Sequence, residues 1–339
     1  MARAQLRVGW ATSAWKVTPG PTPRTLDPPV AMRTLNIGRW IDRHDRSLTT
    51  ELYRPGRRYD VVVFVKTMDE HARREAERIQ AYGGRVVFDA NVNYYEIWGE
   101  YDIPGTKPTA EQQRDAVEMT QLADWVVADS SYLLEIVSKH TDSASWIPDN
   151  VDTRLFRPGW RRNRRGPLRL VWSGMAHKAR HLLLVRDELA GVAELELLVV
   201  SNERPEALAE LAPAVRCHFA RFSLRRYARL LRSCDVIVSP KRLGNGYELG
   251  HSEWKITLGM AAALPAVASP QRSYQEAIGH RQGGVIAESP AEWRAALERL
   301  RDDAEHRREL GRRAVETVRE RYATPVVAPQ YRDLLCSLS

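Results

Sequence analysis

Short runs of β-branched and aromatic residues alternate with amphipathic stretches along most of the chain. The clearest run, residues 61–65, is Val-Val-Val-Phe-Val, apolar at every position like strands that are buried on both faces of a sheet. The charged stretch after it, from about Asp69 to Ala81, is predicted to be a helix that ends at Gly83 and Gly84. Strands that alternate with helices indicate βαβ units and a parallel sheet. The pattern therefore predicts an α/β fold.

This alternation occurs twice, in two sets of similar length. A polar, basic stretch at residues 158–167 separates the sets and is typical of an interdomain linker. We predict two facing Rossmann-like domains, at residues 1–157 and 158–325, and a final helix at 326–339 that packs back on the first domain. Because ligands of doubly wound sheets bind beyond the carboxyl ends of the strands, we expect ligands in the cleft between the domains. The predicted strands are residues 7–12, 61–65, 85–89, 125–128 and 145–147, then 169–172, 195–200, 235–238 and 266–268.

Composition narrows the class of protein. Of 339 residues, 28% are charged and 43% hydrophobic, which is a globular composition. No run approaches the roughly 18–20 apolar residues of a membrane-spanning helix, and the amino-terminal segment lacks the apolar core of a signal peptide. Three cysteines without a Cys-x-x-Cys pair indicate neither a disulfide framework nor a zinc site. A cytoplasmic protein is expected.

The net charge of +8 favours anionic partners such as sugar nucleotides, phospholipid head groups or nucleic acid. One predicted helix carries Arg225, Arg229 and Arg232 on one face, which could meet a membrane or a nucleic acid. A solvated helix face is the simpler interpretation. We expect no nucleic-acid partner, and we leave peripheral association with a membrane open.

Two segments of the second domain have the residues of a phosphate site. In the first, Gly174 follows a predicted strand and Lys178 lies just behind it. A glycine there lets the main chain approach a phosphate, while a helix N-terminus and a lysine supply positive potential. An ordinary strand-to-helix turn is the alternative interpretation.

The second segment, residues 240–269, is a glycine-rich loop followed by a helix. The helix is predicted to begin near Ser252, so that Lys255 lies in its first turn, where the helix dipole attracts a diphosphate. Pro265 ends the helix before the next strand. The glycines of the loop are Gly244, Gly246 and Gly250.

Residues 260–269, Met-Ala-Ala-Ala-Leu-Pro-Ala-Val-Ala-Ser, and the loop before them resemble the nucleotide-sugar segment of GT-B glycosyltransferases, especially the family-4-like retaining group. Further stretches resemble the same group in the same order, over roughly residues 86–322. These stretches are residues 123–133, 147–152 with 156–158, 222–240 and 314–322.

The resemblance implies a GT-B fold and an enzyme that moves a sugar from a nucleotide-diphosphate sugar to a hydroxyl acceptor, with retention of configuration. The acceptor would be a glycan, a lipid-linked molecule or a small molecule. Basic side chains would neutralise the leaving diphosphate, so no metal and no cofactor are expected. We predict Lys178 and Lys255 as catalytic residues. The predicted donor-binding residues are Gly174, Met175, His177, Arg180, Gly250, His251, Ser252 and Glu253.

On the acceptor side, polar residues follow two strands of the first domain, where core packing explains them poorly. In relatives, a His or Asp at about the position of Asp89 contacts the acceptor hydroxyl or the donor sugar, so Asp89 is a further predicted catalytic residue. A loop aspartate that caps the next segment is the alternative. Lys66, Asn91 and Asn93 are the predicted acceptor-binding residues.

The chain departs from the family pattern at two places. The family carries two glutamates separated by seven residues, and here Gly250 and Leu258 occupy those positions, while Glu248 and Glu253 lie out of register. Met175 replaces the arginine of the usual phosphate grip. Two other functions stay open: a sugar-nucleotide 2-epimerase on the same fold, and a basic, non-catalytic nucleic-acid binder. The epimerase needs carboxylates in the cleft, and the missing second glutamate argues mildly against it.

Overall fold

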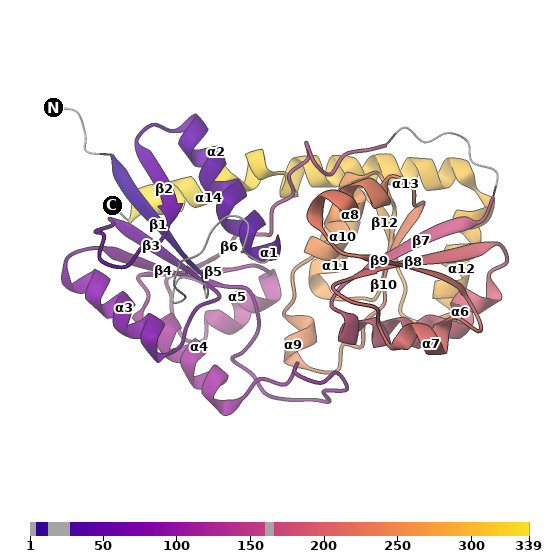
Figure 1. Ribbon diagram of the computed structural model, residues 1–339, viewed down its shortest axis with the longest axis horizontal. Helices are drawn as coiled ribbons and strands as arrows, with labels where there is room; N and C mark the ends of the chain where they lie inside the picture. Colours follow the sequence, from indigo (N-terminus) through magenta and orange to yellow (C-terminus); the bar gives the residue numbers. More distant parts are fainter. Residues whose placement is uncertain (1–4, 13–27, 160–165, 339) are drawn as a thin grey trace.

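The computed structural model describes residues 5–12, 28–159 and 166–338, which form two parallel sheets (Figure 1). The strand order is β2-β1-β3-β4-β5-β6 in the first sheet and β12-β11-β10-β7-β8-β9 in the second. All neighbouring strands in both sheets run parallel. The predicted α/β class, with two Rossmann-like sheets, is confirmed. We call β1 to β6 with their helices the N-terminal lobe, and β7 to α13 the C-terminal lobe.

The strands have the following bounds. In the N-terminal lobe they are β1 (Leu6–Thr12), β2 (Leu48–Leu52), β3 (Val61–Val65), β4 (Arg85–Ala90), β5 (Trp125–Ala128) and β6 (Ala144–Trp146). In the C-terminal lobe they are β7 (Leu168–Ser173), β8 (Leu195–Ser201), β9 (Arg216–Arg221), β10 (Val236–Ser239), β11 (Ala266–Ala268) and β12 (Gly284–Ile286).

Three strands were missed by the sequence prediction, namely β2, β9 and β12. All three lie at an edge of their sheet. In β9 the exposed and covered residues largely alternate, with Arg216 and Arg221 exposed. Edge strands face solvent on one side and therefore lack the continuous apolar run that reveals a central strand.

In each sheet the strand order reverses at one point. In the first sheet β1 lies between β2 and β3, and in the second sheet β7 lies between β10 and β8. Such a reversal leaves a crevice outside the carboxyl ends of the two diverging strands, where doubly wound proteins bind ligands. The second sheet thus places its crevice after Ser173 of β7 and Ser239 of β10.

α-Helices, a 3₁₀ helix and two π-helical turns connect the described strands. The N-terminal lobe has α1 (Pro28–Ala31), the π-helical turn η2 (Met32–Asn36), α2 (Ile37–His44), α3 (Glu70–Ala81), α4 (Ala110–Leu122) and α5 (Ser131–Val137). The C-terminal lobe has the 3₁₀-helical η3 (Ala176–Val185), α6 (Arg186–Gly191), α7 (Ala207–Leu211), α8 (Leu224–Leu231), α9 (Gly246–Leu249), α10 (Trp254–Ala261), α11 (Arg272–Gly279), α12 (Pro290–Asp302) and α13 (Ala304–Thr317). The π-helical η4 (Val318–Tyr322) and α14 (Thr324–Ser337) follow.

Local sequence explains several helix starts. Asp69 accepts a hydrogen bond from the main-chain N–H of Ala72 and so caps α3, and Ser130 caps α5 in the same way. One expectation was wrong in detail: the glycine-rich loop contains the short helix α9 before α10 begins at Trp254. Towards the carboxyl terminus, Asp303 ends α12 and caps α13.

The carboxyl-terminal part of the chain crosses from one lobe to the other. A β-bridge joins Val151 to Ala323, so the two crossing segments lie side by side. Beyond this point α14 packs against α2 and the N-terminal sheet, with Val327, Tyr331 and Leu335 fully buried. In Figure 1, α14 lies against the N-terminal lobe. The exact domain limits at residues 157, 158 and 325 stay predictions.

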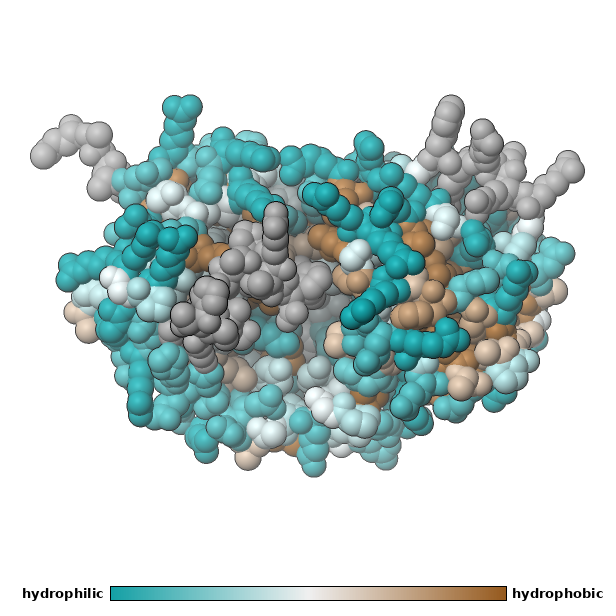
Figure 2. Space-filling model, viewed as in Figure 1, coloured by the Kyte–Doolittle hydropathy of each residue, from teal (hydrophilic) through white to brown (hydrophobic). Residues whose placement is uncertain are grey.

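Hydrophilic residues cover most of the face seen in Figure 2. On α8, Arg225, Arg226 and Arg229 are exposed, while Arg232 is partly covered and donates a hydrogen bond to the carbonyl of Leu155. Among the described residues, no helix is both long enough and apolar enough to cross a membrane.

Candidate active site

Three lysines converge at the crevice of the C-terminal sheet. Lys178 comes from η3, Lys241 follows β10, and Lys255 lies in the first turn of α10. Lys178 and Lys255 were predicted from the sequence, whereas Lys241 was missed. All three ammonium groups act on the same carboxyl group, Glu248 of α9, which is 2% exposed.

Glu248 is the anionic partner in this cluster. Its carboxylate lies 3.2 Å from Nζ of Lys241 and 3.8 Å from Nζ of Lys178. Burial alone would raise the pKa of Glu248, but the charges of Lys241 and of neighbouring cations outweigh burial and hold it well below its usual range. Glu248 therefore carries a negative charge, and the surplus of positive charge around it favours a further anion.

Burial also lowers the pKa values of two of the lysines. It lowers the pKa of Lys178 to about 8 and the pKa of Lys255 to about 7. For Lys255 the nearby ammonium groups of Lys241 and Lys178 lower the pKa further. Both groups are thus only partly charged near neutral pH, and an anion placed between them would restore the charged form.

Lys255 occupies a tightly packed position. Its Nζ lies 5.0 Å from the centre of the Trp172 ring, a cation–π contact. A Cβ at Gly174 would lie 2.8 Å from the Trp172 ring and 3.4 Å from this Nζ. Glycine at position 174 is therefore required for the lysine and the end of β7 to lie this close together.

The histidines divide into two groups. Nε2 of His251 lies 3.0 Å from Nζ of Lys178, and burial lowers the pKa of His251 well below its usual range. His181 is also buried in the cluster, and burial lowers its pKa to about 3. His181 was not predicted from the sequence, because its position inside η3 carries no motif. His177, by contrast, is exposed together with Met175 and Arg180, and these three side chains form no hydrogen bond or ion pair within the described chain.

Other predicted donor residues face the N-terminal lobe. The carbonyl of Gly250 accepts a hydrogen bond from Oγ of Ser130 at 2.9 Å, and Oγ of Ser252 donates to Asp149 at 2.6 Å. Glu253 precedes α10 and is fully buried. The structure therefore gives Gly250 and Ser252 contacts between the lobes, and donor binding by these residues stays a prediction.

The predicted acceptor residues have different surroundings. Asn93 is fully buried and donates to the carbonyl of Gly246 at 3.1 Å, a contact between the lobes. Asn91 donates to Asp89 at 3.2 Å. Lys66 is exposed at the end of β3 with a φ of +53°, and its charge lowers the pKa of Lys178 from across the cleft. Strained backbone of this kind is often found at functional sites.

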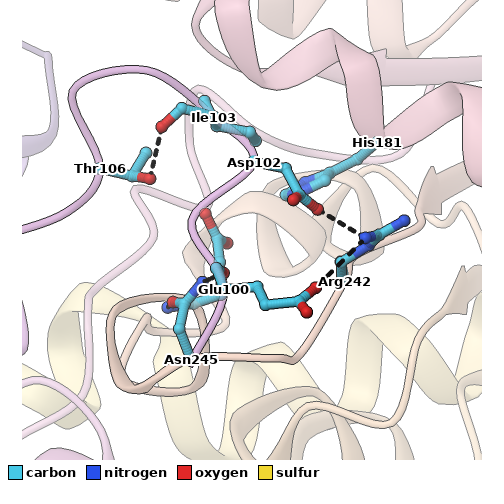
Figure 3. A pocket seen from close by; sticks show the side chains of 8 residues that line it. Glu100, Asp102, Ile103, Thr106, His181, Arg242 and Asn245 are labelled. Atoms are coloured by element: carbon cyan, nitrogen blue, oxygen red, sulfur yellow. Dashed lines mark hydrogen bonds and ion pairs between the residues drawn. The ribbon is translucent and has the colours of Figure 1, made fainter. Parts of the chain in front are cut away.

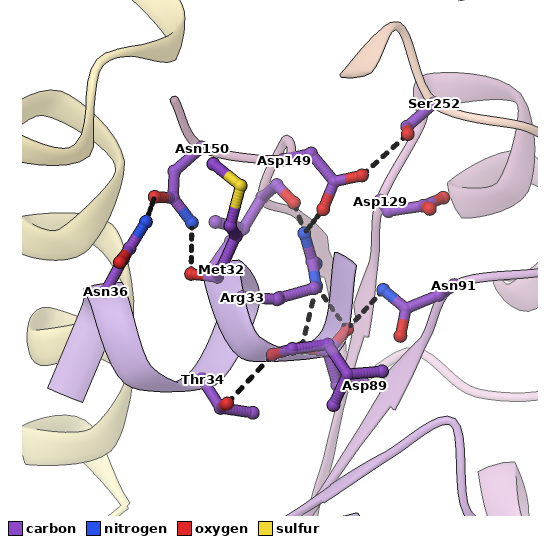
Figure 4. Close-up of polar contacts among 12 residues, drawn as sticks. Met32, Arg33, Thr34, Asn36, Asp89, Asn91, Asp129, Asp149, Asn150 and Ser252 are labelled. Carbon is purple, nitrogen blue, oxygen red and sulfur yellow. Dashed lines mark hydrogen bonds and ion pairs between the residues drawn. The ribbon is translucent and has the colours of Figure 1, made fainter. Parts of the chain in front are cut away.

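Asp89 lies at the carboxyl end of β4, as predicted, but its carboxylate is buried and has several donors (Figure 4). Nε of Arg33 donates to both carboxylate oxygens at 2.8 Å, and the hydroxyl of Tyr331 donates at 2.5 Å. Arg33, which was not predicted from the sequence, comes from η2 and is 2% exposed. These contacts hold Asp89 in the structure of the N-terminal lobe, and its contact with an acceptor stays a prediction.

A small pocket lies between the lobes beside the lysine cluster (Figure 3). Glu248 and His181 connect it to the cluster, and Arg242 closes one side through an ion pair with Asp102 at 2.7 Å. Its lining residues are Glu100, Asp102, Ile103, Thr106, His181, Arg242, Asn245 and Glu248. No group of three or more His, Cys, Asp or Glu within the described ranges is arranged to hold a metal ion.

Comparison with solved structures defines the class of fold. HepE from Anabaena, in complex with UDP and glucose, aligns with 98% of this chain and 100% of its own, at 13% identity and a TM-score of 0.69. Sucrose-phosphate synthase from Thermosynechococcus elongatus aligns over 94% of this chain and 81% of its own, at 14% identity and a TM-score of 0.66. A glycosyltransferase from Rickettsia africae aligns over 99% and 98%, at 13% identity and 0.67. The chain has the GT-B fold.

The family match falls on the lobe that carries the lysines. The family model of glycosyl transferases group 1 matches residues 167–303. A sequence search of curated proteins finds no match. The matched segment lies within a GT-B fold, and the predicted resemblance and enzyme class are confirmed.

Proposed function

We propose that this protein transfers a sugar from a nucleotide-diphosphate sugar to a hydroxyl acceptor, and that Lys178, Lys241 and Lys255 bind the diphosphate. The observation that carries the proposal is the convergence of three lysines on a single carboxylate at the crevice of the C-terminal sheet. Stabilisation of the charge that develops on a leaving group usually contributes more to catalysis of this kind than any other effect. The lysine cluster supplies that stabilisation.

The position of α10 supports the same proposal. Lys255 lies in the first turn of this helix, where free main-chain N–H groups and the helix dipole favour anions. Gly174 brings the main chain at the end of β7 next to the same ammonium group. Cationic side chains and main-chain amides thus lie together at this crevice, the combination that binds a diphosphate in other proteins.

We further propose that transfer proceeds with retention of configuration and without a metal ion. The resemblance to the retaining group supports retention, and the cationic side chains support neutralisation of the diphosphate by the protein. Activity should persist in EDTA, and the anomeric configuration of the product should match that of the donor by NMR. Loss of activity in EDTA with recovery on addition of Mg²⁺ would contradict metal independence.

Uridine diphosphate sugars are the first donors to test. HepE structures contain UDP and UDP-glucose, and a TarM structure contains UDP. Isothermal titration calorimetry with UDP, UDP-glucose and GDP measures donor binding directly. We expect micromolar binding of at least one nucleotide. If neither a nucleoside diphosphate nor a nucleotide sugar binds, the proposal is contradicted.

The lysine cluster is tested by Lys178→Met and Lys255→Met. Each substitution removes one charged contact with the diphosphate, so the Kd for the nucleotide should rise by roughly tenfold or more, as hydrogen bonds to charged groups contribute about 1.5–3 kcal/mol. Lys107→Met is the matched control, because Lys107 is exposed and outside the site. An unchanged Kd in both site variants would remove these residues from the donor site.

A further inference from the structure

A group of buried acidic side chains lies where the two lobes meet, apart from the lysine cluster. Asp89 lies near the end of β4 and Asp129 follows the neighbouring strand β5. Asp149 lies in the segment between the lobes, and Glu253 precedes α10 of the C-terminal lobe. Asp89, Asp129 and Glu253 are 0%, 3% and 0% exposed. Figure 4 shows Asp89, Asp129 and Asp149 around Arg33.

Arg33 is the cation within this group, and its donors are already engaged. Its Nε donates to Asp89, one terminal nitrogen donates to Asp149 at 3.0 Å, and the other donates to the carbonyl of Ile147 at 2.9 Å. The second oxygen of Asp149 accepts from Ser252 at 2.6 Å. Asp89 and Asp149 are therefore satisfied as carboxylates.

Asp129 and Glu253 lack such partners. Oδ1 of Asp129 and both carboxylate oxygens of Glu253 are buried without a hydrogen-bond partner. An ionised carboxylate buried without a donor costs several kcal/mol, whereas a protonated carboxyl group loses much less when it leaves water. The two residues come from different lobes and lie where the lobes touch, since Ser130 beside Asp129 donates to the carbonyl of Gly250 and Ser252 beside Glu253 donates to Asp149.

We propose that the contact between the two lobes takes up protons, with Asp129 and Glu253 as the groups that must be protonated before the lobes close. This inference does not depend on the proposed sugar transfer. Closure is favoured at low pH, and it weakens as the pH rises through the pKa values that these carboxyl groups have in the closed state.

The pKa directions agree with the geometry. Burial raises the pKa of Asp129 well above its usual range, with a further rise from the charge of Asp149. Burial raises the pKa of Glu253 in the same direction, again with a contribution from Asp149. A group with a raised pKa in the closed state binds its proton more tightly there than in the open state, so protonation stabilises the closed state.

Other charged and titratable groups surround this pair on every element packed against it. Those that face Asp129 or Glu253 are Asp89 (β4), Asp149 (the interlobe segment), Glu276 and Tyr274 (α11), Tyr322 (η4) and the cation Arg33 (η2). Asp89, Asp149 and Glu276 are acidic and disfavour a further negative charge. Tyr274 and Tyr322 are uncharged, because burial raises the pKa of each hydroxyl. Across the cleft, the charges of Lys66 and Lys178 repel each other. Loss of that repulsion at high pH would favour closure, whereas ionisation of the two carboxyl groups disfavours it.

Small-angle X-ray scattering of the ligand-free full chain tests the proposal. We expect a larger radius of gyration at pH 8.5 than at pH 5.5, because the ratio of closed to open protein falls by up to about tenfold per pH unit for each group that must be protonated. Glu253→Gln and Asp129→Asn place an uncharged side chain of the same shape at each position. The double variant should keep the small radius at both pH values, and each single variant should show a weaker dependence on pH, because one carboxyl group must still be protonated.

Glu135→Gln is the matched control, since Glu135 joins the lobes by an exposed ion pair with Arg272 at 2.7 Å. It should respond to pH like the unmodified chain. An unmodified chain with the same radius at both pH values would overturn the proposal, as would a double variant that opens at pH 8.5 like the unmodified chain, or a Glu135→Gln chain that no longer opens. Circular dichroism verifies that each variant is folded. If the double variant does not fold, two single variants with the full pH dependence of the unmodified chain would overturn the proposal.

Discussion

Lys255 shows how the surroundings of one residue change its chemistry. A lysine in water is charged at any physiological pH, yet burial beside Trp172 and two further lysines lowers the pKa of Lys255 to about 7. In the absence of an anion the side chain is therefore close to half protonated at neutral pH. Because the pKa of Lys255 lies near neutral pH, the charge of the site depends on whether a diphosphate is bound.

We expect the affinity for UDP to fall as the pH rises from 6.5 to 9. The diphosphate favours the charged lysines and raises their pKa values, so binding takes up protons in the range above the free values of about 7 for Lys255 and about 8 for Lys178. Calorimetry in buffers with different ionisation enthalpies measures this uptake.

The Lys255→Met chain should lose the part of the pH dependence that lies near pH 7 and keep the part near pH 8. A UDP affinity that is constant from pH 6.5 to 9, with no proton uptake, would show that these lysines do not contact the diphosphate.

At the scale of single elements, the turn from β7 into η3 fixes the shape of the proposed diphosphate site. Trp172, at the end of β7, is fully buried, and Gly174 leaves room for the ring and for Lys255 above it. Since the ring cannot move outward, a side chain at position 174 would displace either the ring or the main chain.

Gly174→Ala should therefore weaken nucleotide binding by about tenfold and destabilise the fold by about 1–3 kcal/mol. Isothermal titration calorimetry and urea unfolding measure the two effects. Gly244→Ala is the control, because a Cβ at that glycine would meet only Arg242, at 3.9 Å. Equal nucleotide affinity and stability in the two variants would show that the close approach at Gly174 has no consequence.

At the scale of the whole molecule, the carboxyl-terminal helix links the two lobes and makes the stability of one depend on contacts from the other. α14 leaves the C-terminal lobe and packs on α2, and Tyr331 reaches from it to Asp89 beneath Arg33. The helix thus supplies one donor to a buried ion pair of the other lobe. Removal of this donor leaves the carboxylate with fewer partners.

Tyr331→Phe should lower the free energy of unfolding by about 1–3 kcal/mol, the cost of a buried polar group that loses a partner. Urea unfolding followed by circular dichroism measures the change. Tyr132→Phe is the control, since the hydroxyl of Tyr132 forms no hydrogen bond within the described ranges. A Tyr331→Phe chain as stable as the unmodified chain would show that Arg33 alone satisfies Asp89.

The architecture of the two lobes could be predicted from local patterns in the sequence. Central strands such as residues 61–65 are buried on both faces, so their apolar runs are visible in the sequence, and capping residues such as Asp69 and Ser130 mark helix starts by local hydrogen bonds. Lys178 and Lys255 could be named because a glycine after a strand and a lysine in the first turn of a helix are local patterns.

Only the tertiary structure shows which side chains meet in space. Lys241, Arg33 and His181 have no motif around them, and each acquires its surroundings from elements far away in the chain, as in the 56 positions between Arg33 and Asp89. Asp129 and Glu253 are likewise buried by residues far away in the chain, as the charge of Glu253 acting on Asp129 shows. Ion pairs and desolvation follow from distances in space, and a local sequence pattern does not encode those distances.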